Sequence, residues 1–328
     1  MSQTHLQDYQ DSPAARVELL DFLNRTGHPP AGTCSWEARL SHWWDQNPHA
    51  SQHPLRGYIV RHEGRIVGYG GTIPSSYSFQ GQRIPSLYAT TLRADAEFHR
   101  AGIQMLMRLR SLGREVMVTH TTPIPKLQEL LIRMGARAEA SVRRHLFPTG
   151  LGARLTGKHQ LWPKLDSSLR LTLNLDEVKS IAPLSRPQNR IEKWLCLDSL
   201  RWQLNTPMYN FRFLGAIDDT GALHAYLILH DRTRIFRYLK GWDVVEAWTA
   251  HASPESMHAL LGSLVHRPAL IGPQRHWLTT TAFPDDDTWK SAPSLVSRQQ
   301  AVCHFFMLPA PLKELSKHTV MAEGDLVL

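Results

Sequence analysis

The segment from Leu92 to Leu106 has the residue types of an anion-binding junction. A strand-like run leads into a short loop and then into a helix that contains one early glycine, Gly102. The first N–H groups of a helix have no partner within the helix, and the helix dipole makes that end positive. Since such an end binds phosphate groups, we predict a diphosphate site, with Arg100 adding charge, formed by His99, Arg100, Ala101, Gly102, Ile103 and Gln104.

Glu246 is a second candidate functional residue, because its carboxylate lies within an otherwise apolar, strand-like run from Val244 to Trp248. An unpaired carboxylate is costly to bury. Two interpretations stay open: Glu246 faces a polar cleft between two halves of the chain and holds an amine there, or it points outward from an edge strand.

Metal and disulfide patterns are absent from the sequence. The 18 histidines include no HExxH motif, and the three cysteines, Cys34, Cys196 and Cys303, lie far apart. They form neither a disulfide framework nor a CxxC knuckle. We therefore expect no metal site and a reducing, cytoplasmic location.

The elements that position these residues follow from hydrophobic periodicity and turn residues. Helical spacing is seen in Val17, Leu20 and Leu23, after a Ser12-Pro13 cap, and again in Trp36, Leu40 and Trp43. Further along the chain we predict a hairpin of 57–62 and 65–78, strands at 85–92, 116–119 and 142–147, and helices around 103–109 and 125–134. This order indicates a mixed α/β fold, with helices and strands sharing one sheet.

The chain also contains a duplication. Short similarities recur at offsets of 157 to 159 residues, pairing Trp44 with Trp202, Tyr69 with Tyr226, Leu87 with Val244 and His145 with His304. A repeat this long indicates a duplicated domain. We expect a first domain at 1–147, a linker rich in glycine at 148–165, a second domain at 166–310 and a tail at 311–328. The second copy has no glycine between His251 and Leu260, so we predict that it binds no diphosphate.

Composition narrows the class of protein. Of the 328 residues, 42% are hydrophobic and 20% are charged, which excludes long disorder and coiled coil. The net charge of +8 favours anionic partners: nucleic acid, a phosphate-bearing cofactor or an acidic lipid surface. Neither a signal peptide nor an apolar run of about 20 residues is present, so we expect an unsecreted protein without a membrane span.

Taken together, these features resemble the Gcn5-related N-acetyltransferase (GNAT) superfamily. Its signature, R/Q-x-x-G-x-G/A, follows the fourth strand. Here Glu97-Phe98 matches the usual lead-in and Gly102 matches the first glycine, whereas His99 and Gln104 depart from the pattern. Over residues 14–310 the duplication is similar to that of tandem acyltransferases of this superfamily, the second copy being degenerate.

The resemblance implies transfer of an acyl group from acetyl-CoA, or another acyl-CoA, to the amine of an acceptor, most simply a small molecule. In the family the pantetheine arm pairs with the fourth strand, here at Leu92, Arg93 and Ala94. A backbone N–H near Leu92 would polarise the thioester carbonyl. Thr122 lies near the position of an asparagine that contacts pantetheine in relatives.

Acyl transfer to an amine also needs groups that move protons. His120 follows the strand 116–119 at the end beside the thioester, and imidazole titrates near neutral pH; the alternative is a loop histidine without a role. The family's tyrosine acid position falls on Leu131. Tyr88, on the fourth strand, is then the substitute acid, unless it is a core aromatic.

Two other functions stay open at this stage. One is a transferase that takes its acyl group from aminoacyl-tRNA, as tandem relatives that build peptidoglycan bridges do; the net charge and Gln104 favour it. The other is a non-catalytic module that binds acyl-CoA or another ligand through the retained fold. Apart from tRNA in the first alternative, we expect no nucleic acid partner.

Overall fold

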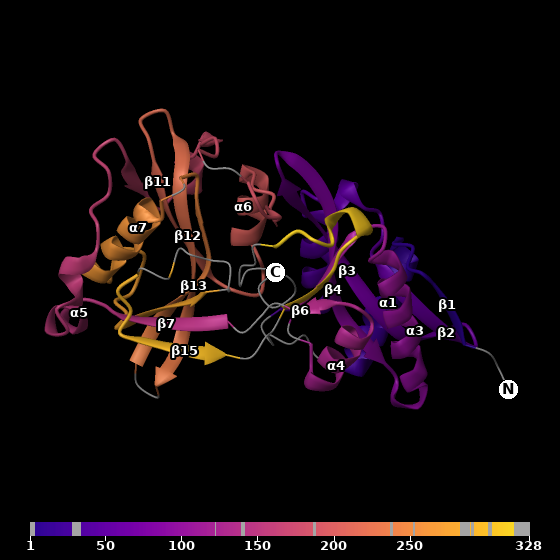
Figure 1. Ribbon diagram of the computed structural model, residues 1–328. Coiled ribbons are helices and arrows are strands. Elements are labelled where there is room, and N and C mark those ends of the chain that lie inside the picture. Colours follow the sequence, from indigo (N-terminus) through magenta and orange to yellow (C-terminus); the bar gives the residue numbers. More distant parts are fainter. Residues whose placement is uncertain are drawn as a thin grey trace.

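Two halves, each built on an eight-stranded mixed sheet, make up the protein (Figure 1). The computed structural model describes residues 4–27, 34–121, 123–138, 142–185, 188–236, 239–251, 253–282, 289, 292–300 and 304–317. The predicted mixed α/β fold, repeated in tandem, is confirmed. In the described part of the chain, no helix is long and apolar enough to cross a membrane.

The first sheet has a main path of seven strands. Their order is β1 (His5–Asp8), β2 (Gly57–His62), β3 (Arg65–Phe79), β4 (Gln82–Ala94), β5 (Met117–Thr121), β16 (His304–Met307) and β6 (Arg137–Ala138), with β10 (Glu192–Lys193) paired to β3. The helices of this half are α1 (Pro13–Thr26), α2 (Trp36–Leu40), α3 (His99–Leu112) and α4 (Pro125–Arg133). The elements predicted up to residue 134 are therefore confirmed, whereas the strand predicted at 142–147 is formed but belongs to the second sheet.

The second sheet repeats the first in strand order. It runs β8 (Arg170–Thr172), β11 (Phe211–Ile217), β12 (Ala222–Phe236), β13 (Leu239–Thr249), β14 (Trp277–Ala282), β7 (Val142–Pro148) and β15 (Val296–Gln300), with β9 (Ser180–Ile181) paired to β12. Its helices are α5 (Leu151–Leu155), α6 (Leu197–Leu204) and α7 (Glu255–His266). In each sheet the fourth and fifth strands of the path are parallel.

The sixth strand of each path comes from the other half of the chain. Strand β16, near the C-terminus, lies between β5 and β6 of the first sheet, whereas β7 lies between β14 and β15 of the second. His145 and His304, which the sequence comparison aligned, therefore lie on strands that occupy equivalent places in the two different sheets. The two halves have exchanged a strand.

The sheets do not divide at the expected boundaries. The 1–147 segment contributes β7 to the second sheet, and the 166–310 segment contributes β16 to the first. The expected linker at 148–165 is part of the second half, because Ala153 and Trp162 are buried in that half's core. The reason is physical: an apolar strand pattern specifies burial in a sheet, but not which of two similar sheets receives the strand.

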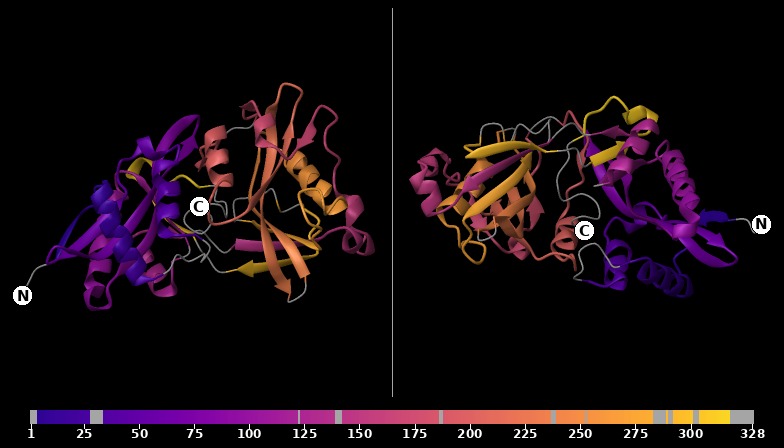
Figure 2. Two further views of the ribbon diagram at one scale, coloured as in Figure 1. Left: turned by 180° about the vertical axis from the view of Figure 1, so that it is seen from behind. Right: turned by 90° about the horizontal axis from the view of Figure 1, so that it is seen from below.

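Helix α6 lies between the two sheets (Figure 2, left). Its side chains also connect the two halves. Trp202, on α6, is buried in the core of the first half, where its indole N–H donates to His42 O at 2.7 Å. The His42 and Trp202 rings stack with centroids 5.1 Å apart. Strand exchange and α6 therefore make one packed unit of the two copies.

The exchanged strand β16 should stabilise the first half. Phe306 is 1% exposed and lies in the core that contains α1 and α2. We expect Phe306→Ala to lower the free energy of unfolding by about 3–5 kcal/mol, measured by urea denaturation. Hydrogen exchange of the β5 amides should accelerate in this variant.

Ser297→Ala, on the exposed face of β15, is the control and should change neither quantity. If the β5 amides of Phe306→Ala exchanged hydrogen as slowly as those of the wild type, β16 would not be needed to stabilise the first half.

Candidate active site

Strands β4 and β5 part at the centre of the first sheet. They pair in parallel from Ser86 with Met117 to Ala89 with His120. Beyond that pair β4 continues to Ala94 and remains paired to β3, without a pairing to β5. Among the described residues, no strand pairs with the β5-facing edge of residues 90–94, a geometry that suits an extended ligand.

A β-bulge bends β4 at this point. Between the pairs Thr90–Gly71 and Arg93–Tyr69, Thr91 and Leu92 lie opposite the single residue Gly70. Thr91 has φ of 49°, a left-handed conformation that is unfavourable for a β-branched residue. Bulges bend the strand that contains them, and strained residues of this kind cluster at functional sites. The opening is thus built into the backbone of β4.

Helix α3 begins beside the opening with its first turn accessible. Among the described residues, no side chain caps its N-terminus, which follows Phe98. A side chain added at Gly102 would meet nothing within 4 Å, whereas one added at Gly68 would lie 3.1 Å from the Ala101 methyl. Gly68 thus lets α3 pack closely on β3, and Gly102 leaves space in front of the helix. This geometry suits a phosphate group.

The residues predicted to bind the cofactor fall into three groups. His99, Arg100, Ile103 and Gln104 are exposed on the first turns of α3, while Ala101 is buried beneath them. Leu92 and Ala94 are half-buried and pack against the core under α3. Thr122 lies outside the described residues.

The side chain of Arg93 contacts α1 and α2. Its guanidinium donates to Thr26 O at 2.7 Å and lies 5.1 Å from the Trp36 ring centroid. Burial, followed by the charge of Arg39, lowers the pKa of Arg93. The side chain of Arg93 is therefore engaged with α1 and α2, and its backbone remains the part that lies along the opening.

His120 lies at the last β4–β5 pair before the strands part. It is 5% exposed, and burial lowers its pKa to about 4. Its Nε2 has no hydrogen-bond partner among the described residues. The imidazole is therefore neutral at pH 7 and keeps one ring nitrogen uncommitted beside the opening.

Tyr88 lies on the other face of the sheet. Tyr88 pairs with Thr119 and Ala89 pairs with His120, and successive residues of a strand point to opposite faces. The Tyr88 hydroxyl lies 3.3 Å from the Tyr77 hydroxyl inside the core. The structure thus places Tyr88 as a core aromatic and does not bring it together with His120.

Glu246 is buried in the second sheet and is fully paired. Its carboxylate accepts hydrogen bonds from Lys193 Nζ at 2.7 Å, Gln203 Nε2 at 2.8 Å and the Tyr226 hydroxyl at 2.5 Å. Burial, then Glu246, raises the pKa of Tyr226, which stays protonated. Because β13 lies between β12 and β14, Glu246 is not on an edge strand. Lys193 already supplies the amine partner of its carboxylate.

The strand exchange brings a further histidine, missed in the sequence, to the end of β5. His304 on β16 pairs with Thr121, which follows His120. It is fully buried, and its pKa falls to about 3 because of burial and then Lys317. The signal for this residue was its alignment with His145, but without the exchange that alignment assigns His304 to the second sheet.

The second half keeps the opening but not an accessible helix start. Pairing of β13 to β14 ends at Val244 with Thr280, and β13 has a register shift directly after that pair, at Val245. However, Glu255 adds a negative charge to the first turn of α7, and its N–H donates to Ser253 Oγ at 3.3 Å. These features disfavour a phosphate at the start of α7. Among the described residues, no group of three or more metal-ligand side chains is present.

Comparison with known proteins identifies the fold. No protein-family model matches the sequence, and no curated protein matches it. In structure the chain is similar to a GCN5-related N-acetyltransferase from Kribbella flavida, with TM-score 0.57 and 13% identity over 93% of this chain and 71% of that chain. A second such enzyme, from Anabaena variabilis, has TM-score 0.56 and 12% identity over 93% and 72% of the two chains. Eis1 from Mycobacterium abscessus has TM-score 0.54 and 13% identity over 93% and 73%.

The ion pair between Lys193 and Glu246 should contribute to the free energy of unfolding. Lys193→Met leaves the buried carboxylate without its cation, so we expect unfolding to become easier by about 3–5 kcal/mol. Lys193→Met/Glu246→Gln removes both charges and should recover part of that loss. Urea denaturation of the wild type and the three variants, including Glu246→Gln alone, measures this coupling; additive losses would rule it out.

Proposed function

We propose that the protein is an N-acyltransferase that moves an acyl group from acetyl-CoA, or another acyl-CoA, to an amine, because the chain is similar in fold to GCN5-related N-acetyltransferases. The observation that carries this proposal is the parting of β4 and β5 after Ala89 and His120, directly beside the open start of α3 at Gly102. A strand-like arm and a diphosphate need these two features in this order.

Binding of the donor would use mainly the backbone. The β5-facing edge of residues 90–94 pairs with the pantetheine arm as an added strand, and the α3 amides near Gly102 receive the diphosphate. Arg100, exposed in the first turn, adds positive charge. Coenzyme A supplies the activated thioester in this proposal.

The protein's own groups would then act on the thioester. A backbone N–H at the bulge near Leu92 donates to the carbonyl oxygen, where negative charge develops. The amine attacks the carbonyl carbon, a C–N bond forms and the C–S bond breaks. His120 accepts the proton released by the amine and returns it to the thiolate sulfur. With Tyr88 in the core and Leu131 at the family's tyrosine position, His120 serves as both base and acid.

Gly102→Glu tests the donor site. Its carboxylate would enter the open space in front of α3, so acetyl-CoA affinity should fall at least about 100-fold, which corresponds to about 2.8 kcal/mol. Isothermal titration calorimetry with acetyl-CoA measures the change. Ser111→Glu, at the opposite end of α3, adds the same charge and should bind acetyl-CoA as the wild type does.

A wild-type protein that binds neither acetyl-CoA nor a longer acyl-CoA would exclude the proposed function. Binding without thiol release across a panel of amines would instead identify a non-catalytic module.

His120→Ala tests the proton transfer. Loss of a general base lowers kcat by about 10²- to 10⁴-fold, while acetyl-CoA affinity should remain. Because burial holds the His120 pKa at about 4, the imidazole stays neutral above that pH. Apart from the ionisation of the acceptor amine itself, activity of the wild type should therefore decline only as pH falls toward 4, when His120 becomes protonated. An acid limb near pH 6.5 that does not move with the pKa of the acceptor amine would show that another group is the base.

A further inference from the structure

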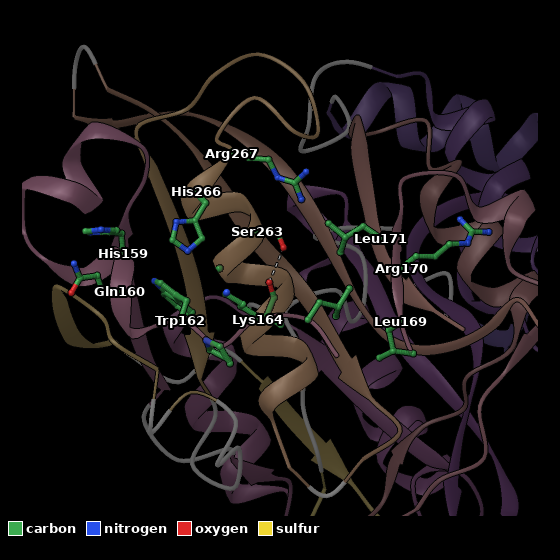
Figure 3. Close-up of a pocket in the computed structure, with 14 residues that line it drawn as sticks. His159, Gln160, Trp162, Lys164, Leu169, Arg170, Leu171, Ser263, His266 and Arg267 are labelled. Carbon is green, nitrogen blue, oxygen red and sulfur yellow. Dashed lines mark hydrogen bonds between the residues drawn. The ribbon is translucent and has the colours of Figure 1, made fainter. Parts of the chain in front are cut away.

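A cavity of about 540 Å³ lies in the second half, between α7 and the segment that leads into the edge strand β8 (Figure 3). One wall is the last two turns of α7, and the other is the chain from His159 to Leu171. Its size is that of a small-molecule site. It is formed within the second half and lies apart from the opening between β4 and β5.

The floor of this cavity is apolar and continuous with the core. Trp162 is buried, and Leu165, Leu169 and Leu171 are partly buried against the same core cluster. A side chain at Gly262 would come within 2.8 Å of Trp162 Cβ, so the glycine allows this wall to approach α7. The result is a rigid apolar surface open to solvent on one side.

The rim is cationic. Lys164, Arg170, His159, His266 and Arg267 line the cavity, and no Asp or Glu is among its described lining residues. Arg170 pairs with Glu177 at 2.6 Å and points away from the others in Figure 3. Lys164 and Arg267 form no ion pair in the part of the chain that the structure describes, so their charges remain uncompensated.

Helix capping explains only part of this charge. Arg267 follows the C-terminal end of α7, where a cation complements the helix dipole. Lys164 comes from a different segment and has no such role. Burial, followed by the charges of His159, Arg154 and Arg267, lowers the pKa of His266 and so disfavours its charged form. The cavity therefore presents the positive charges of Lys164 and Arg267 above an apolar floor.

We propose that this cavity binds an amphiphilic anion, with its apolar body on Trp162 and the leucines and its carboxylate or phosphate beside Lys164 and Arg267. Such a ligand can be a free fatty carboxylate or a lipid headgroup with the start of its chain, since both present the same chemistry. The site is independent of the proposed acyl transfer.

Calorimetric titration of the full chain with octanoate, octylammonium and octan-1-ol tests the charge preference. These probes share one alkyl chain, and we expect octanoate to bind most tightly and octylammonium least. Lys164→Glu/Arg267→Glu should weaken octanoate at least tenfold, which corresponds to about 1.4 kcal/mol. Arg212→Glu, an exposed charge reversal on β11 outside the cavity, should bind octanoate as the wild type does.

Ser263→Phe provides a second test that leaves the charges in place. Ser263 lies on the α7 wall, so a phenyl ring there fills the cavity and should abolish octanoate binding. Circular dichroism melting confirms that each variant is folded, and Lys164→Met replaces the double reversal if that variant is not. Equal affinity for octanoate and octylammonium, or binding unaffected by Ser263→Phe, would overturn the proposal.

Cosedimentation with phosphatidylglycerol vesicles separates the two sources of the anion. Vesicle binding that the double reversal abolishes assigns a lipid headgroup. Octanoate binding without vesicle binding assigns a free carboxylate. If neither octanoate nor vesicles bind, the cavity has no such function.

Discussion

The exchange of β7 and β16 is the constraint on which the rest of the structure depends. An edge strand presents unpaired N–H and C=O groups, and each half places a strand from the other beside its fifth strand. Phe305 and Phe306 of β16 then complete the two cores on either face of the first sheet. The first half is therefore closed by β16, which follows the whole of the second half in the sequence, whereas the strands of the second sheet all lie within residues 142–300.

This closure also fixes the candidate active site. Strand β5 is held by β16 on one side and by β4 on the other, but only as far as the pair Ala89–His120. The bulge at Thr91 and Leu92 then bends β4, while Gly68 lets α3 pack closely on β3. Backbone geometry, more than any reactive side chain, creates the place for a strand-like ligand and a phosphate.

The two halves show how a duplicated frame acquires different chemistry. Both keep the parting of the central parallel strands and the register shift beside it. In the first half the helix start beyond the opening is accessible, whereas in the second it carries Glu255 and a Ser253 contact. Beside the second opening, Glu246 is used in a buried ion pair with Lys193 that stabilises the fold. The cationic cavity next to α7 lies on a different surface.

The sequence by itself determined the helices and strands of the first half, the duplication and the strand-loop-helix around Gly102, because these depend on local periodicity and on one glycine. It also placed His120 at the end of its strand. Only the tertiary structure decided which sheet receives β7 and β16, that Tyr88 and His120 lie on opposite faces, and that Glu246 is paired with Lys193. These outcomes depend on long-range strand pairing and side-chain packing, and a local pattern specifies that a residue is buried without specifying its partners.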